Sequence, residues 1–190
     1  MNKKKSQYNA GISLIEVLIA TAIFSVVMVV SVGALISMNN SNKKAQTTRI
    51  VMDNLNFAME NMSRNLRIGT TYHCAIGTGI VTSPRDCSIG SDASDSSISF
   101  FGHKGNQIIY RLNSSNHQIE SSIDAGLTYL PITSPELSVD NLIFYVVGAP
   151  AGDGKQPRVT IVISGTAVFS NGTQSKFQVE TSASQRQLDS

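Results

Sequence analysis

Gly11-Ile12-Ser13-Leu14-Ile15-Glu16-Val17-Leu18-Ile19-Ala20 opens an apolar run that continues to Met38. As a helix, the 27 residues of this run are long enough to cross a hydrocarbon core about 30 Å thick. Glu16 is the one charged side chain in the run. A charge at this depth costs about 3 kcal/mol on insertion scales, so Glu16 needs a partner or a functional explanation.

Residues 1–11 form a polar leader that carries Lys3, Lys4 and Lys5. The positive-inside rule predicts that this leader stays in the cytoplasm and that the rest of the chain is exported. A secretory signal is cut after a shorter apolar stretch, and Ser31-Val32-Gly33-Ala34 is a poor site for that. A cut between Gly11 and Ile12 would instead keep the helix on the mature chain. It would also create an α-amine close to Glu16, on the same chain or on a neighbouring copy.

The leader and the segment Gly11–Ala20 resemble the prepilin cleavage and methylation motif of type IV pilins and type II secretion pseudopilins. The resemblance implies cleavage after Gly11, N-methylation of Ile12 and an assembly salt bridge from Glu16, the fifth mature residue, to the Ile12 amine of a neighbour. The chain departs from the family at Ile12, where Phe is usual, and at Gly33, near the helix-breaking Pro of many major pilins.

The same resemblance implies the partners and the location. The partners are a prepilin peptidase/methyltransferase, other pilins or pseudopilins in a hetero-oligomeric filament, an inner-membrane assembly platform and membrane lipid. We expect a single-pass protein of the cytoplasmic membrane whose head is exported and which joins a filament after assembly. The segment from Val139 to Arg186 loosely resembles J-type minor pseudopilins, which favours a minor, non-enzymatic subunit.

The helical pattern continues over residues 39–68 with a narrower apolar stripe. Apolar residues recur there at spacings of three and four, as on one face of a helix: Val51, Leu55, Ala58 or Met59, Met62 and Leu66. Gly69 is expected to end the helix. We interpret the stripe as a docking face for a sheet, with core packing preferred over any cofactor role.

Residues 69–96 are predicted to be a connecting loop that holds Cys74 and Cys87. Because the head is expected to be exported, a disulfide between the two cysteines is the favoured interpretation. Two alternatives stay open. One is a metal site that adds His73 to the cysteines, although there is no CxxC spacing; the other is a pair of independent thiols.

Residues 97–190 read as an antiparallel β head. Short strands are predicted at 98–101, 107–112, 118–123, 141–147, 158–164 (with an extension to 169) and 176–182. Ser170-Asn171-Gly172-Thr173 is a hairpin signal. The inward residues are expected to be Ile143, Tyr145, Val159, Ile161, Ile163, Phe177 and Val179. The predicted fold is α+β and pilin-like, a long N-terminal helix packed against a C-terminal antiparallel β-sheet.

The head offers no recognisable catalytic set, and no cofactor or metal is expected. His103 and His117 are isolated from other candidate catalytic residues. Asp153 could offer oxygens to a calcium ion, but a single carboxylate close to Lys155 is a weak set of ligands. Without the leader lysines the chain has 12 basic and 13 acidic side chains, so it lacks the footprint of a general nucleic-acid binder.

Two other functions remain open. The first is a membrane-anchored protein whose head grips DNA, an exoprotein or a surface. Its basic residues would have to form a local patch: Lys104, Arg111, Lys155, Arg158 and Lys176. The second is an ordinary single-pass protein that is never processed, which would leave Glu16 unexplained.

Overall fold

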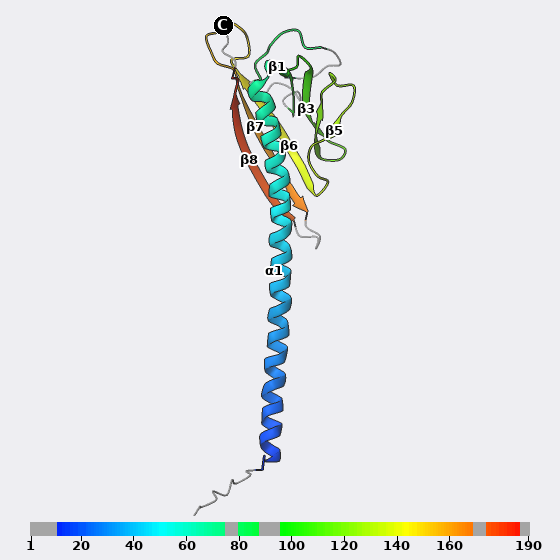
Figure 1. Ribbon diagram of the computed structural model, residues 1–190, viewed down its shortest axis with the longest axis vertical. Helices are drawn as coiled ribbons and strands as arrows, with labels where there is room; N and C mark the ends of the chain where they lie inside the picture. The colour runs from blue at the N-terminus through cyan, green and yellow to red at the C-terminus, as the bar shows by residue number, and fades with distance from the viewer. Residues whose placement is uncertain (1–10, 75–79, 88–95, 169–173, 187–190) are drawn as a thin grey trace, which may run out of the picture. The chain divides into compact units, whose positions relative to one another are not determined.

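The computed structural model describes residues 11–74, 80–87, 96–168 and 174–186 (Figure 1). The chain divides into two compact units, Met1–Ala45 and Gln46–Ser190. In the part of the chain that is described, every buried hydrophobic side chain falls between Val51 and Ala183. The second unit, here called the head, therefore has a core of its own.

One long helix, α1, runs from Leu14 to Ile68. It begins where the Ser13 carbonyl accepts the N–H groups of Glu16 and Val17, at 3.1 and 3.3 Å. It ends before Gly69, where an added Cβ would collide with the Phe100 ring. The predicted helix and its end at Gly69 are confirmed.

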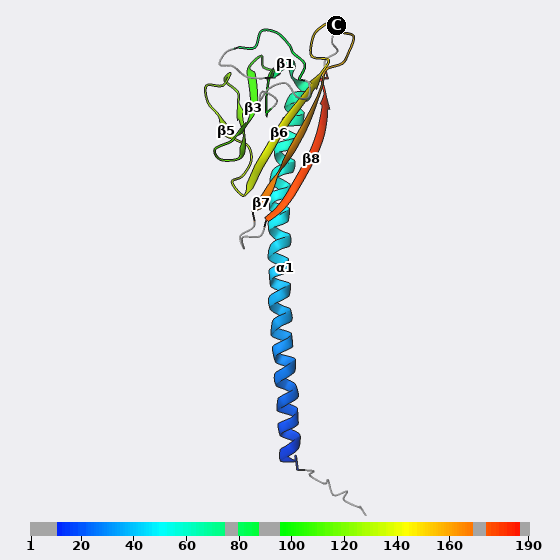
Figure 2. The ribbon, with the colours of Figure 1, turned by 180° about the vertical axis from the view of Figure 1, so that it is seen from behind.

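The predicted stripe on the second half of α1 is the helical side of the core. All of its residues are buried, and both Ala58 and Met59 belong to it. In Figure 1 this half of α1 lies in front of β6, β7 and β8, and in Figure 2, seen from behind, the same sheet lies in front of the helix. The stripe therefore packs as a docking face for a sheet.

The described residues of the head form two antiparallel sheets. The first has the order β1-β2-β3-β4-β5, and its strands are β1 (Thr70–Cys74), β2 (Ser97–Phe101), β3 (Gln107–Asn113), β4 (Gln118–Ser122) and β5 (Leu130–Pro131). The second has the order β6-β7-β8, with β6 (Leu137–Val147), β7 (Arg158–Val168) and β8 (Gln174–Ser184). The α+β fold is confirmed.

The single sheet expected from the sequence is divided at β5. This strand has only two residues, and one of them is Pro131. Proline has no N–H to donate, so it ends a ladder of strand hydrogen bonds. The chain then enters β6, which pairs with β7 in the second sheet.

The inward face of β6 differs from the prediction. Leu142, Phe144 and Val146 are buried, whereas Ile143 and Tyr145 are partly exposed. The cause is a bulge at Asp140, because Val139 pairs with Gly165 and Asn141 with the adjacent Ser164. An extra residue in one strand reverses the alternation of its side chains beyond that point.

On β7 and β8 the predicted alternation holds. Val159, Ile161 and Ile163 are buried, and Phe177 and Val179 pack against the core from β8. β7 and β8 pair without interruption from Arg158 opposite Ser184 to Val168 opposite Gln174. The hairpin signal at residues 170–173 lies outside the described residues.

Candidate functional site

The N-terminal segment is the first candidate site. Gly11, Ile12 and Ser13 precede the first helical residue and are exposed. A Cβ placed on Gly11 would meet no other atom within 4 Å. In this structure the Gly11–Ile12 peptide is thus reachable by an enzyme, without any need to unwind the helix.

Glu16 lies in the first turn of α1. The unpaired N–H groups at a helix N-terminus favour a negative charge there, so this position partly compensates the carboxylate. Glu16 also lines a shallow surface groove, together with Ile12, Val17, Ala20, Thr21 and Phe24. The groove is apolar apart from Glu16 and the Thr21 hydroxyl, so Glu16 is the charged group that a neighbouring molecule would meet here.

The surface of α1 from Leu14 to Met38 is apolar and exposed. From Ile12 to Met38 all side chains are exposed, and the helix is long and apolar enough to cross a membrane. Three of its hydroxyl groups bond to its own backbone. Thr21 donates to the Leu18 carbonyl, Ser25 to that of Thr21 and Ser31 to that of Val27, at 2.7 to 3.0 Å. These bonds lower the cost of placing hydroxyls in an apolar medium.

Cys74 and Cys87 form the predicted disulfide, with their Cα atoms 5.9 Å apart. Cys74 belongs to β1, where it pairs with Ile98 of the first sheet. Cys87 pairs with Val146 of β6 through two backbone hydrogen bonds of 3.0 and 3.3 Å. The disulfide therefore connects the two sheets.

The alternative use of His73 with the cysteines is not supported by the geometry. Both sulfurs are bonded to each other, and the His73 Nδ1 atom is buried with no hydrogen-bond partner. Within the described ranges, no group of three His, Cys, Asp or Glu side chains could hold a metal ion. At the weak calcium candidate, the Asp153 carboxylate accepts the backbone N–H of Lys155 at 2.7 Å, as in a local turn.

The basic residues of the head are not brought into one patch. Arg158 begins β7, whereas Lys176 of β8 lies opposite Thr166, near the other end of β7. Eight residues of strand correspond to about 26 Å. Arg111 is engaged with Glu120, its guanidinium Nη2 lying 2.9 Å from the carboxylate.

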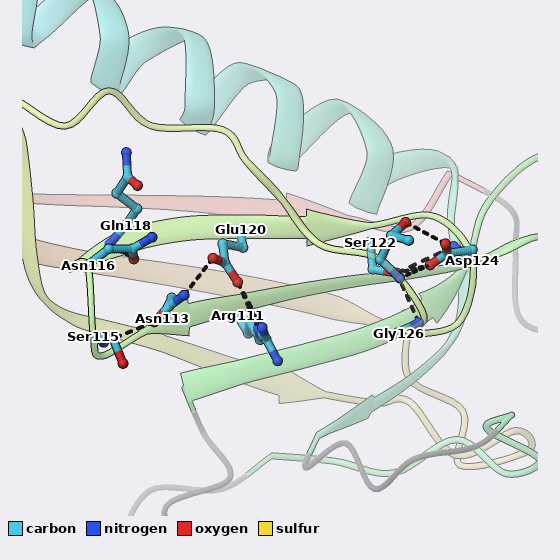
Figure 3. A network of polar contacts seen from close by, with 10 residues as sticks. Arg111, Asn113, Ser115, Asn116, Gln118, Glu120, Ser122, Asp124 and Gly126 are labelled. Atoms are coloured by element: carbon cyan, nitrogen blue, oxygen red, sulfur yellow. Dashed lines mark hydrogen bonds and ion pairs between the residues drawn. The ribbon is translucent and has the colours of Figure 1, made fainter.

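Arg111 and Glu120 belong to a polar network on β3 and β4, shown in Figure 3. Glu120 accepts hydrogen bonds from Asn113 at 2.6 Å and from two nitrogens of Arg111. Burial alone would raise the pKa of Glu120, but the hydrogen bonds and charge of these neighbours outweigh it and hold the pKa below its usual value. The Arg111 guanidinium also stacks on Tyr129, 3.4 Å from the ring centroid.

This network was not predicted from the sequence, although one signal for it is present. The turn between residues 113 and 118 sets the hairpin register that places Arg111 directly opposite Glu120. The groups of this network are held by one another. The network can stabilise the hairpin and fix the position of Tyr129.

Comparison with known proteins identifies the N-terminal segment. Residues 6–32 match the family model of the prokaryotic N-terminal methylation motif. No curated protein and no solved structure matches the chain. The motif, the apolar helix that it overlaps and the α+β head support recognition of the chain as a type IV pilin or pseudopilin precursor.

Proposed function

We propose that this chain is a non-enzymatic filament subunit, a minor pilin or pseudopilin that assembles through α1 into a type IV pilus or a type II secretion pseudopilus. The observation that carries the proposal is the uncovered apolar segment from Ile12 to Met38, with one carboxylate in the first turn of its helix, inside the methylation motif. An apolar surface of this size is unfavourable in water, so lipid must cover it before assembly and neighbouring helices must cover it afterwards.

Processing comes first in this proposal. A prepilin peptidase cuts the exposed Gly11–Ile12 peptide, and the new α-amine of Ile12 is then methylated. The leader stays in the cytoplasm because of its lysines, the helix anchors the chain as a single pass, and the head is exported. The inner-membrane assembly platform then receives the processed chain.

Assembly follows from the charge on Glu16. In lipid this carboxylate is costly, and the cationic α-amine of a neighbouring subunit can neutralise it. The pairing fixes the axial offset between two subunits while their apolar helices bundle. As the helices leave lipid for the filament core, the apolar surface stays out of water. The loose likeness of residues 139–186 to J-type minor pseudopilins supports a minor subunit near the filament tip.

The role of Glu16 is tested with Glu16→Ala in cells that assemble filaments. We expect the variant to insert into the membrane as the native chain does and to be depleted from sheared filaments. Glu60→Ala is the matched control, because Glu60 is an exposed carboxylate on the head half of the same helix. Normal incorporation of the Glu16 variant would contradict the pairing.

A further inference from the structure

Two adjacent lysines follow the apolar segment of α1. Lys43 and Lys44 belong to the same compact unit as that segment, Met1–Ala45, and both are exposed. No acidic side chain occurs in the sequence between Glu16 and Asp53. The positive-inside rule makes basic residues less frequent beside the exported end of a membrane span. In the proposed orientation the pair is at that end, so it calls for a partner there.

The helix fixes how far these lysines stand from the apolar run. α1 passes through them without a break (Figure 1), so each residue adds about 1.5 Å. Lys43 and Lys44 come five and six residues after Met38, which corresponds to about 8 and 9 Å along the helix axis. The headgroup layer on each side of a hydrocarbon core is about 5–7 Å thick. The Cα atoms of the pair therefore lie close to the outer limit of that layer.

Two further effects bring the ammonium groups back among the headgroups. The Cα–Cβ bonds of a helix are tilted toward its N-terminus, which for these lysines is the direction of the span. In addition, the 27 residues of the apolar run make a helix about 40 Å long, and a helix longer than a core of about 30 Å tilts. Tilting lowers each later residue toward the membrane surface.

The segment between the apolar run and the lysines carries no charge. Residues 39–42 are Asn-Asn-Ser-Asn, and all four are exposed. Their amides and hydroxyl suit the polar interface, but they offer no carboxylate that competes for the lysines. An ammonium group donates up to three hydrogen bonds and attracts phosphate. Near an anionic membrane surface each such group strengthens association about fivefold.

We propose that Lys43 and Lys44 bind the headgroups of anionic phospholipids in the leaflet on the exported side of the membrane that α1 spans. The contact holds this end of the span at a fixed depth, while Glu16 lies near the opposite end. When the helix leaves lipid for a filament, the pair exchanges these headgroups for water or for neighbouring subunits. The inference rests on the membrane-spanning part of the proposed function and adds to it a lipid class and two residues.

Fluorescence quenching on the full chain tests this contact. The chain contains no Trp, so Ile36→Trp supplies a single reporter at an exposed position of the apolar run, two helical turns before Lys43. The protein is reconstituted in vesicles with equal amounts of phosphatidylcholine and phosphatidylglycerol, and one lipid or the other carries brominated acyl chains. Bromine quenches Trp on contact, so the two samples report which lipid lies beside the helix. We expect phosphatidylglycerol to be preferred about fivefold at low salt, and less as salt screens the charges.

Two double variants of the reporter protein show whether the lysines cause the preference. Lys43→Gln/Lys44→Gln should abolish it, so that both brominated lipids quench equally. Arg64→Gln/Arg67→Gln is the matched control, because it removes the same charge from two exposed positions farther along α1, and it should keep the preference. Equal quenching with both lysines present, or a preference that survives their loss, overturns the contact.

Extraction of the same vesicles with alkaline carbonate separates this inference from the function on which it rests. A chain that stays in the vesicles but shows no lipid preference overturns the lysine contact alone. A chain that carbonate removes does not span the bilayer, and that result overturns the membrane anchor of the proposed function together with the contact.

Discussion

Asn65 of α1 donates a hydrogen bond of 2.7 Å to the hydroxyl of Tyr110 on β3. The Tyr110 hydroxyl in turn donates to the Asn61 side chain at 3.1 Å, so a partly buried polar contact joins the helix to the first sheet. Burial raises the pKa of Tyr110, although Asn65 and the charge of Arg64 act in the opposite direction. The hydroxyl is thus neutral and able to donate over the physiological range.

Tyr110→Phe should destabilise the head by about 1 kcal/mol, because the partly buried amides of Asn61 and Asn65 lose their hydrogen bonds to the hydroxyl and keep only the one between themselves. The measurement is urea unfolding of residues 46–190, the unit that contains the buried core. Tyr145→Phe is the control, since Tyr145 is only partly buried, and it should cost less than about 0.5 kcal/mol. Equal effects of the two changes would contradict a role for this contact.

Loss of the disulfide should weaken the head strongly. The bond joins residues 13 apart in sequence, and the chain-entropy model assigns about 3 kcal/mol to a loop of this size. We expect the Cys74→Ala/Cys87→Ala variant to unfold at a lower urea concentration than the oxidised head. A reductant should lower the midpoint of the native head and leave that of the variant unchanged; a native midpoint insensitive to the reductant would refute the prediction.

Glu120 should contribute stability that depends on pH. Its pKa in the folded head lies below the ordinary value of 4.5. The neighbours of Glu120 in the folded head therefore stabilise the ionised carboxylate more than the protonated one. Its contribution is complete above the pKa of the unfolded chain and is lost as the pH falls through the lowered folded pKa. The difference in unfolding free energy between the native head and Glu120→Gln should therefore shrink on acidification below about pH 4.5. A difference that grows in acid would have the wrong sign.

The bulge in β6 predicts opposite sensitivities for neighbouring residues. Leu142 is buried and Ile143 is partly exposed, because the extra residue Asp140 shifts the alternation. Leu142→Ala should cost about 2–5 kcal/mol, as other large-to-small core changes do, and Ile143→Ala clearly less. Thermal or urea unfolding of the two head variants measures both losses of stability. A larger loss for Ile143→Ala than for Leu142→Ala would contradict the β6–β7 register described above.

The features predicted correctly from the sequence are those whose signal is local. The helix and its buried stripe follow from apolar spacing, and the methylation motif lies in one short segment. The bulge at Asp140 could not be found in this way, because both possible faces of β6 are apolar. β1 was not predicted because Thr70–Cys74 has little apolar alternation and forms a strand through its pairing with β2. The stacking of Arg111 on Tyr129 likewise depends on the path of the β4–β5 loop.

The central claim is that the chain is a processed filament subunit, and its most direct test is the N-terminus of the mature protein. The intact mass and the N-terminal sequence are determined from cells with and without a prepilin peptidase. The account predicts a chain that begins at Ile12, with its α-amine methylated, only when the peptidase is present. A chain that still begins at Met1 in both strains, or one cut after Met38, would contradict it.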